Sequence, residues 1–342
     1  MAKSNALSFS FQSITLIVLT LGIFLLVSLQ LKKFCAIDAQ PPLIPITPKT
    51  MSSFAQKPAP VTVGITITDF PEFKVASNTF VMRGIIWFRF DPSLISLSTV
   101  EQFSFVKGTL DYRSPALTQL DGDMVIARYD IKATFRTDLY YGFFPFEDHT
   151  LYFMLTNATV SPDEMLFDSS YADVLVDNPS VNGWTFDDHR VTVGYQRIPF
   201  GGTLSKKAIT HPVVLVALDF FQDSIRYIFT IFLPLLIIFY ITMFSFCFDQ
   251  VEEHSTLVSL TTANIAALVT YRFIIETMTP PVGYPTIADH LYFLFLTITF
   301  LTFLINSVGP YLTIFQKKIV SITIQVLVFL AILYLLFFWI PC

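Results

Sequence analysis

The chain has 342 residues and a net charge of −5, and only 14% of its residues are charged while 53% are hydrophobic. Soluble domains average about 25% charged residues, and the shortfall here is concentrated in positions 224–342, whereas positions 40–223 have an ordinary mixture. This composition predicts two parts that fold in different solvents. It argues against a nucleic-acid partner, because no basic run is longer than two residues.

An apolar run at residues 13–31 stands first in the chain. It is longer than the about 7–15 apolar residues of a typical signal peptide, and residues 36–39 offer only a weak cleavage site. Residues 1–39 are therefore either a cleaved signal peptide or a retained anchor helix with a linker, and both would export the domain that begins at residue 40. Lys32 and Lys33 would lie outside the membrane beyond an anchor, which slightly favours cleavage.

Residues 40–223 have the pattern of strands. Positions 61–68 and 127–135 alternate apolar and polar residues with a period of two. Turn-forming residues lie between the strand candidates, at 120–123, 177–179, 182–183 and 201–202. Further strands are expected at 79–90, 149–156, 190–197 and 212–220. Many short strands with frequent turns predict an Ig-like β-sandwich outside the membrane, and residues 40–60 an extended linker or entry strand before it.

Residues 224–342 contain four apolar runs, each close to the about 20 residues that a helix needs to cross a bilayer. The runs lie at 224–247, 255–277, 288–311 and 319–341. Pro234 falls inside the first run, and a membrane helix tolerates it when neighbouring groups satisfy the freed carbonyl. Lys317 and Lys318 precede the last run and place that loop in the cytoplasm. We therefore expect an α+β membrane protein with a four-helix transmembrane bundle.

The second apolar run differs from the others because it is rich in small and hydroxyl residues. Its opposite side carries Leu257, Leu260, Leu268, Tyr271 and Ile275. Such a stripe suits close helix packing in lipid, or the wall of a water-filled pore, and the sequence leaves both open. At helical spacing the stripe comprises Ser255, Ser259, Thr262, Ala266, Thr270, Phe273 and Thr277.

Residues that would carry catalysis are missing from the sequence. We find no Gly-rich phosphate loop, no nucleophile elbow and no pair of metal ligands, and the five histidines lack metal-ligand spacing. The Asp187–His189 cluster comes after Trp184 at a turn and is typical of a solvated loop. The expectation is a protein that is not an enzyme and needs no cofactor or metal.

Residues 144–153 read Phe-Pro-Phe-Glu-Asp-His-Thr-Leu-Tyr-Phe. This segment resembles the signature loop of pentameric ligand-gated ion channels, the Cys-loop receptor superfamily, with Glu147 and His149 in place of the usual Asp and Gln. The flanking cysteines are missing, as in the prokaryotic branch. The resemblance covers most of 60–340. Five further segments match the family in the order in which they occur along the chain: 64–70, Trp87 with Asp91, 182–184, the region of Pro234, and 276–289.

The resemblance implies a homo-pentamer in the bacterial inner membrane, with the β-domain in the periplasm and the second apolar run of each subunit lining a pore. Glu252 and Glu253 would then form a negative ring at the cytoplasmic mouth that attracts monovalent cations, although two solvated loop carboxylates would look the same. Phe273 is the bulkiest residue of the stripe and is the expected gate, unless it packs against a neighbouring helix.

The resemblance also implies a coupling region at the base of the β-domain. Its members are expected to be Phe144, Pro145, Phe146, Glu147, His149, Arg226, Glu276, Pro280 and Tyr284. The stimulus stays open. Protons are one candidate, because carboxylates and His149 cluster in this region and histidine as a residue type titrates near neutrality, and a small ligand is the other. Ligand-binding candidates are Trp87, Tyr195 and Phe200, but the stretch between Trp87 and Ala127 is shorter than in that family. The competing hypothesis is a non-conducting, membrane-anchored β-sandwich that acts as a sensor or assembly protein.

Overall fold

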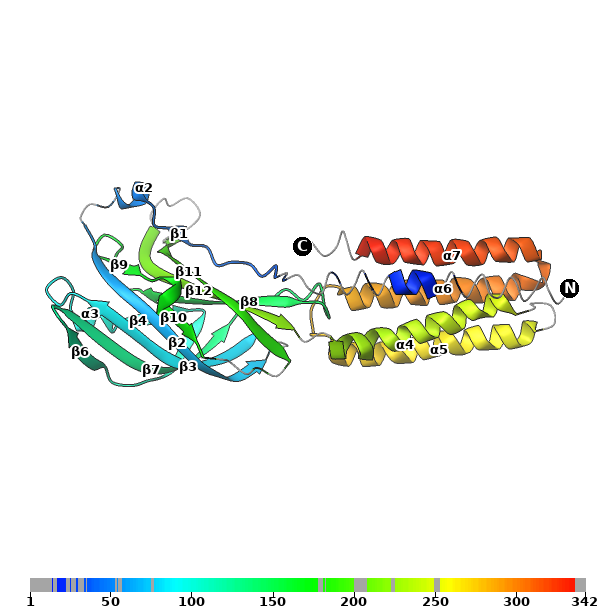
Figure 1. The fold of residues 1–342 in the computed structure, drawn as a ribbon, viewed down its shortest axis with the longest axis horizontal. Helices are drawn as coiled ribbons and strands as arrows, with labels where there is room; N and C mark the ends of the chain where they lie inside the picture. The colour runs from blue at the N-terminus through cyan, green and yellow to red at the C-terminus, as the bar shows by residue number, and fades with distance from the viewer. Residues whose placement is uncertain are drawn as a thin grey trace. The chain divides into compact units, whose positions relative to one another are not determined.

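The computed structural model describes residues 14, 17–22, 25, 29, 34, 36–52, 54, 57–74, 77–177, 181, 183–199, 208–222, 225–248 and 253–335. The chain divides into two compact units (Figure 1). The β-unit comprises Ala36–Tyr140 and Asp148–Gln222, and the helical unit comprises Met1–Cys35, Tyr141–Glu147 and Asp223–Cys342. The expected α+β class, a sheet-rich N-terminal part followed by helices, is confirmed.

Two sheets make up the β-unit. The first sheet has the strand order β1 (Ile44–Pro45), β11 (Trp184–Pro199), β12 (Ala208–Gln222), β8 (Asp148–Asn157) and β4 (Phe103–Val106). The second has the order β10 (Val174–Val176), β2 (Ala59–Lys74), β3 (Thr79–Phe90), β7 (Met124–Arg136) and β5 (Gly108–Arg113). In the same sheet β6 (Leu117–Asp121) pairs with β7, and β9 (Met165–Asp168) pairs with β2 in parallel.

Aromatic side chains from the two sheets meet in the core of the β-unit. The ring centroids of Phe80 in β3 and Phe153 in β8 lie 5.1 Å apart, edge to face. Phe88 in β3 lies 5.1 Å from Phe103 in β4, and a further pair joins β2 to β12. Pairs of this kind contribute about 0.5–1.5 kcal/mol beyond the area that they bury. The two sheets therefore pack face to face through a shared aromatic layer.

The six strand candidates of the sequence all fall within observed strands, β2, β3, β7, β8, β11 and β12. Two features differ from expectation. Residues 40–60 hold the short strand β1 and a one-turn helix α2 (Pro48–Met51), because Thr47 caps that turn and Pro48 starts it. Residues 97–121 hold a one-turn helix α3 (Leu97–Val100) and the strands β4, β5 and β6, which were not expected. All residues of β6 are exposed, so the alternation rule does not predict that strand.

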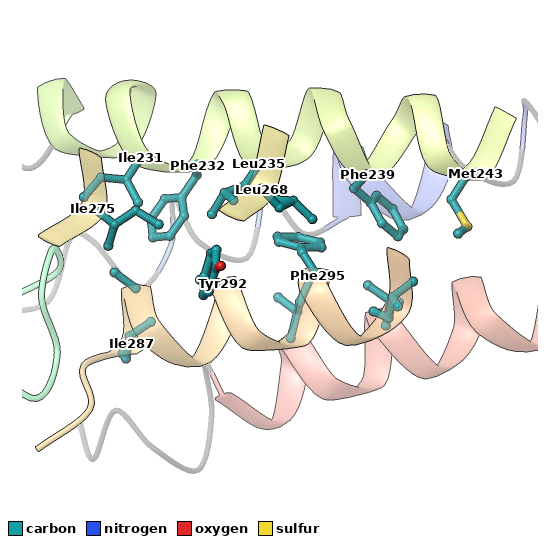
Figure 2. Packing of buried hydrophobic residues seen from close by; sticks show 14 of the residues in the cluster. Ile231, Phe232, Leu235, Phe239, Met243, Leu268, Ile275, Ile287, Tyr292 and Phe295 are labelled. Atoms are coloured by element: carbon teal, nitrogen blue, oxygen red, sulfur yellow. The ribbon is translucent and has the colours of Figure 1, made fainter. Parts of the chain in front are cut away.

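The helical unit contains α4 (Ile225–Phe244), α5 (His254–Met278), α6 (Ile287–Val308) and α7 (Ile314–Tyr334). By length and composition α5 and α6 are apolar and long enough to cross a membrane, while Phe229–Phe244 and Ile319–Tyr334 are shorter apolar helices. Figure 2 shows the apolar cluster between these helices, where side chains of α4 face those of α5 and α6. Its labelled members include Ile231, Phe232, Leu235, Phe239, Leu268, Ile275, Tyr292 and Phe295.

Candidate functional site

All seven residues of the predicted stripe lie on the exposed face of α5. The residues expected on the opposite side are turned inward: Leu257, Leu268 and Ile275 are buried, and Leu260 and Tyr271 are half-buried. Phe273 is the largest side chain of the stripe and is 66% exposed. Other small residues on the same broad face, Thr256, Ala263 and Ala267, are exposed as well.

The neighbouring helices expose a different kind of surface. Across the described residues, α4, α6 and α7 present large apolar side chains outward. These are Phe229, Leu233, Ile237, Ile241 and Phe244 on α4, Phe293, Phe300, Leu301, Leu304 and Val308 on α6, and Phe315, Ile319, Val326, Leu327, Leu330 and Tyr334 on α7. Apolar residues outside are what lipid requires, and α5 differs from the other three because its exposed face is mostly Ser, Thr and Ala, although Val269, Phe273 and Ile274 are exposed on it too.

Polar side chains of the same three helices point inward. The buried ones are Thr242, Ser245 (in the 3-10 turn that continues α4), Thr299, Thr302, Asn306, Ser321 and Gln325. Asn264 of α5 donates a 3.0 Å hydrogen bond to the hydroxyl of Thr242, and Asn306 donates one of 3.0 Å to Ser245. Interhelical hydrogen bonds of this kind stabilise bundles in lipid by about 0.6–2 kcal/mol each.

Hydroxyl groups on the exposed face of α5 share one hydrogen-bonding pattern. Thr262 donates to the carbonyl of Val258 at 2.8 Å, Thr270 to Ala266 at 2.9 Å, and Thr277 to Ile274 at 2.8 Å. A hydroxyl that has used its proton on the backbone presents only oxygen lone pairs to its surroundings. The three threonines therefore offer acceptors, which suit cations better than anions.

The one cationic side chain in the apolar length of α5 is turned away from this face. Arg272 forms ion pairs with Glu276 at 3.0 Å and with Asp289 in the first turn of α6. Its guanidinium also lies over the rings of Tyr292 and Phe293, at 5.4 and 5.8 Å from the centroids. Glu276, expected in the coupling region, is thus held by Arg272, and Arg272 and Asp289 form a clamp that we did not predict.

The N-terminus of α5 follows Glu253, which occupies the N-cap position and is exposed. A carboxylate there is favoured by the positive end of the helix dipole. Glu252, the second member of the predicted ring, lies outside the described residues, and so does the ligand candidate Phe200. Arg226 is exposed in the first turn of α4.

The Tyr141–Glu147 loop, which carries four of the nine predicted coupling residues, folds with the helical unit. Its carbonyls accept from the start of α6: Ile287 N–H donates to Gly142 at 3.0 Å and Ala288 N–H to Phe144 at 3.2 Å. The first N–H groups of a helix lack partners within it, so the loop completes the N-terminus of α6. Tyr284 joins the contact by accepting a 2.9 Å hydrogen bond from the backbone N–H of Tyr141.

Aromatic contacts extend this loop onto α4. Phe146 stacks on Phe232 with centroids 5.3 Å apart and planes 12° apart, and Phe143 and Phe144 are buried in the apolar cluster of the helical unit. Glu147 is buried and Pro280 is half-buried. The loop contacts described here fall on Tyr284, which is the end of the predicted contact region 280–284, and also on the first turn of α6 and on Phe232 of α4.

In the β-unit, His149 belongs to a buried cluster around Asp38. Nδ1 of His149 lies 3.1 Å from Oδ2 of Asp38, and both side chains are 1% exposed. Asp38 also accepts 2.8 Å hydrogen bonds from the backbone N–H groups of Tyr140 and Thr150, and the ring of Trp184 lies 5.2 Å from that of His149. Asp38 thereby ties the two ends of the 141–147 loop together, a role that we did not predict.

The remaining ligand candidates lie on different sheets. Trp87 is half-buried on β3 over Gly64, where a Cβ atom would approach its indole to 2.0 Å. Tyr195 is half-buried on β11, opposite Ile44 and edge to face with Phe54 at 6.1 Å. No described contact brings the two together in one site.

A separate polar cluster lies in the region after Trp87. Tyr129 donates a 3.2 Å hydrogen bond to Glu101, and Arg113 lies over the rings of Phe103 and Tyr129. Burial and then the charge of Glu101 raise the pKa of Tyr129, so its phenol stays neutral.

Comparisons with models of known protein families and with curated proteins find no match to this chain. Among the described residues, no group of three or more His, Cys, Asp or Glu side chains is placed to hold a metal ion.

Proposed function

We propose that this chain is a subunit of a membrane channel, in which copies assemble with the exposed face of α5 toward a shared water-filled path for monovalent cations. The observation that carries the proposal is the contrast in surface: α4, α6 and α7 expose mainly large apolar side chains, whereas α5 exposes mainly Ser, Thr and Ala, with Val269, Phe273 and Ile274 as its large apolar exceptions. The resemblance of residues 144–153, and of the matching segments before and after them, to pentameric ligand-gated channels favours five copies.

The exposed face of α5, with its small Ser, Thr and Ala side chains, needs a partner other than lipid. Its threonine hydroxyls are partly satisfied by their own backbone, but Ser, Thr and Ala make few contacts with acyl chains and pack well against another helix or water. The face is also broader than the stripe, since Thr256, Ala263 and Ala267 lie beside it. In a ring of copies, one flank would pack against the next copy's α5 while the stripe faces the axis.

Selectivity for cations is supported by three features of α5. Thr262, Thr270 and Thr277 present acceptor oxygens, and the positive charge of Arg272 is committed to Glu276 and Asp289. Glu253 stands at the N-terminal end of the helix. Repeated around an axis, Glu253 would form a negative ring at one mouth of the pore and raise the local concentration of cations.

The membrane topology of the proposal uses all four helices. With 25 residues, α5 is about 37 Å long, enough to cross a hydrocarbon core of about 30 Å. The exposed apolar faces of α4 and α7 suit lipid, and Lys317 and Lys318 orient the loop before α7 toward the cytoplasm. The β-unit would then lie outside the inner membrane of a bacterium.

Gating would reach the pore through the 141–147 loop. Because that loop caps α6 and stacks on α4, a change in the β-strands on either side of it would shift both helices. Such a switch needs two packings that differ by only a few kcal/mol. Protons or a small ligand acting on the β-unit are the two candidate stimuli.

The test combines current recording with cysteine accessibility. Purified protein in planar bilayers should carry a cation-selective current under a potassium chloride gradient between neutral and acidic pH. In a background with Cys35, Cys247 and Cys342 replaced by Ser, Thr262→Cys and Thr270→Cys should react with a charged thiol reagent that blocks the current. Ile237→Cys, exposed on the apolar face of α4, is the matched control and should stay unmodified.

Two results would overturn the channel. A monomer or dimer in mild detergent rules out a ring of five copies. Equal reactivity of the Thr262→Cys and Ile237→Cys variants, without current from an oligomer, removes the aqueous path and favours the non-conducting anchored sensor.

A further inference from the structure

The apolar segment at the start of the chain is part of the helical unit. Its described residues, 14, 17–22, 25 and 29, are helical. Large aliphatic side chains at helical spacing are exposed along it: Ile14, Ile17, Val18, Leu21, Leu25 and Leu29. This is the surface that α4, α6 and α7 also present, so the segment has the polarity of a helix that faces lipid on one side.

Residues beside this aliphatic stripe contact the bundle. The hydroxyl of Thr20 is hydrogen-bonded to the hydroxyl of Tyr240 on α4. A Cβ atom placed on Gly22 would meet the ring of Phe329 on α7 at 3.7 Å, which is ordinary packing distance. The segment therefore has a polar contact to one helix and an apolar contact to another, and it is seated against two of the proposed spans.

The stretch after this segment is built into the β-unit. Leu43 packs on Met154, Val213 and Leu215, and β1 pairs with β11. Gly194 on β11 faces the carbonyl of Ile44, where a Cβ atom would approach to 2.4 Å. A side chain at position 194 would thus push this entry stretch off the sheet.

Asp38 lies inside the only cleavage site that the sequence suggests, residues 36–39. Its carboxylate accepts from the backbone of Tyr140 and Thr150 and lies against His149, in a place from which solvent is excluded. Processing after residue 38 or 39 would remove that carboxylate, and with it a solvent-excluded acceptor for the backbone N–H groups of Tyr140 and Thr150.

We propose that the apolar segment whose described residues are 14, 17–22, 25 and 29 is retained as a fifth membrane helix of the mature protein, and that Asp38, a few residues beyond it, is a positioning residue for the backbone at Tyr140 and Thr150. The helix contacts α4 and α7, and the carboxylate holds both ends of the loop that completes α6. This inference does not depend on conduction, so it stands or fails separately from the channel.

The first test uses the unmodified chain with a C-terminal tag, extracted from membranes. Intact mass and N-terminal sequencing should give the full length of 38.8 kDa plus the tag. A mature protein that begins at or beyond Ala36 would overturn the proposal. Since no residue is substituted, a folding failure cannot imitate either result.

The second test locates the helix. In the cysteine-free background, Thr20→Cys with Tyr240→Cys should form a covalent cross-link in membranes with a short bifunctional thiol reagent, because the Tyr240 ring that separates the two Cβ atoms leaves them too far apart for a direct disulfide. Leu21→Cys with Tyr240→Cys is the matched control, because Leu21 points outward, and it should not form one. Gly22→Cys with Phe329→Cys is an independent second pair. Equal cross-linking of the test and control pairs would contradict the contact of this segment with α4 and α7. So would the absence of cross-linking in both test pairs.

The third test concerns Asp38. Asp38→Asn should speed hydrogen exchange of the Tyr140 and Thr150 amides by about tenfold, because a neutral amide oxygen is a weaker acceptor than a carboxylate. Asp123→Asn, at an exposed turn, is the control and should leave both amides unchanged. Unchanged exchange in the Asp38→Asn variant would contradict its positioning role, whatever the currents show.

Discussion

Phe146 stacks on Phe232 with ring centroids 5.3 Å apart and planes 12° apart, and this pair joins the 141–147 loop to α4. The same loop gives its Gly142 and Phe144 carbonyls to the first turn of α6. A single loop of seven residues thus contacts two helices, one by ring stacking and the other by backbone hydrogen bonds. Substitution of Phe146 removes the stacking and leaves the backbone hydrogen bonds to α6 in place.

Replacing Phe146 with Leu should weaken the contact between the 141–147 loop and α4 without leaving a large cavity. The change removes the stacked ring but keeps an aliphatic side chain, so the loss should be about 0.5–1.5 kcal/mol. The thermal midpoint of the detergent-solubilised protein should fall by a few degrees. Phe315→Leu, on an exposed ring of α7, is the control and should leave the midpoint unchanged. Equal shifts in the two variants would show that the stacking contributes nothing specific.

A second prediction concerns the Arg272–Asp289 clamp between α5 and α6. Asp289 also caps α6 by accepting from Thr286, so its carboxylate serves both contacts. Arg272→Gln should destabilise the helical unit by about 2–4 kcal/mol, because it leaves a nearly buried carboxylate without its ion pair. Glu276→Gln removes the more exposed partner and should cost less than about 1 kcal/mol.

A double-mutant cycle separates this clamp from general damage. If the Arg272–Asp289 contact is direct, Arg272→Gln combined with Asp289→Asn should cost clearly less than the sum of the two single changes. Additive losses would mean that the two residues act independently, and would contradict the clamp.

Local periodicity explains which parts of this protein could be predicted. Residues 127–135 alternate because one face of β7 is buried and the other is not, and the stripe on α5 is visible because residues three and four apart share a face. The strand β6 was missed for the complementary reason: all five of its residues are exposed, so no apolar alternation marks it.

Contacts between distant residues left no pattern to find. Asp38 is one carboxylate in a Pro-containing stretch, and its partner His149 is 111 positions away. Arg272 and Glu276 are four apart, a spacing that indicates an ion pair on a helix, but Asp289 joins them only because α5 and α6 lie side by side. The sequence alone therefore predicts the exposed face of α5. The ion pair between Arg272 and Asp289 depends instead on how α5 packs against α6.

The charge at the mouth of the proposed pore gives a third prediction. Glu252→Gln with Glu253→Gln should reduce cation selectivity and lower the conductance at low salt by roughly twofold or more. The effect should shrink as salt rises, because the Debye length falls from about 10 Å at 0.1 M to about 3 Å at 1 M. Glu72→Gln, an exposed carboxylate of the β-unit, is the control and should change neither quantity. A salt-independent loss would point to a structural defect instead of a charge ring.

The exposed ring of Phe273 carries the fourth prediction. In a ring of copies with the stripe facing the axis, five such rings would form an apolar constriction, and a narrow apolar passage excludes water and ions. Phe273→Ala should therefore hold the path open and give current without a stimulus, while Phe273→Leu, which keeps the constriction apolar and bulky, should stay closed at rest. Val269→Ala, one turn away and also exposed, controls for a general loss of side-chain volume on α5. Resting current that is equally low in Phe273→Ala and in the unmodified protein, although the stimulus still opens both, would show that the gate lies elsewhere on the helix.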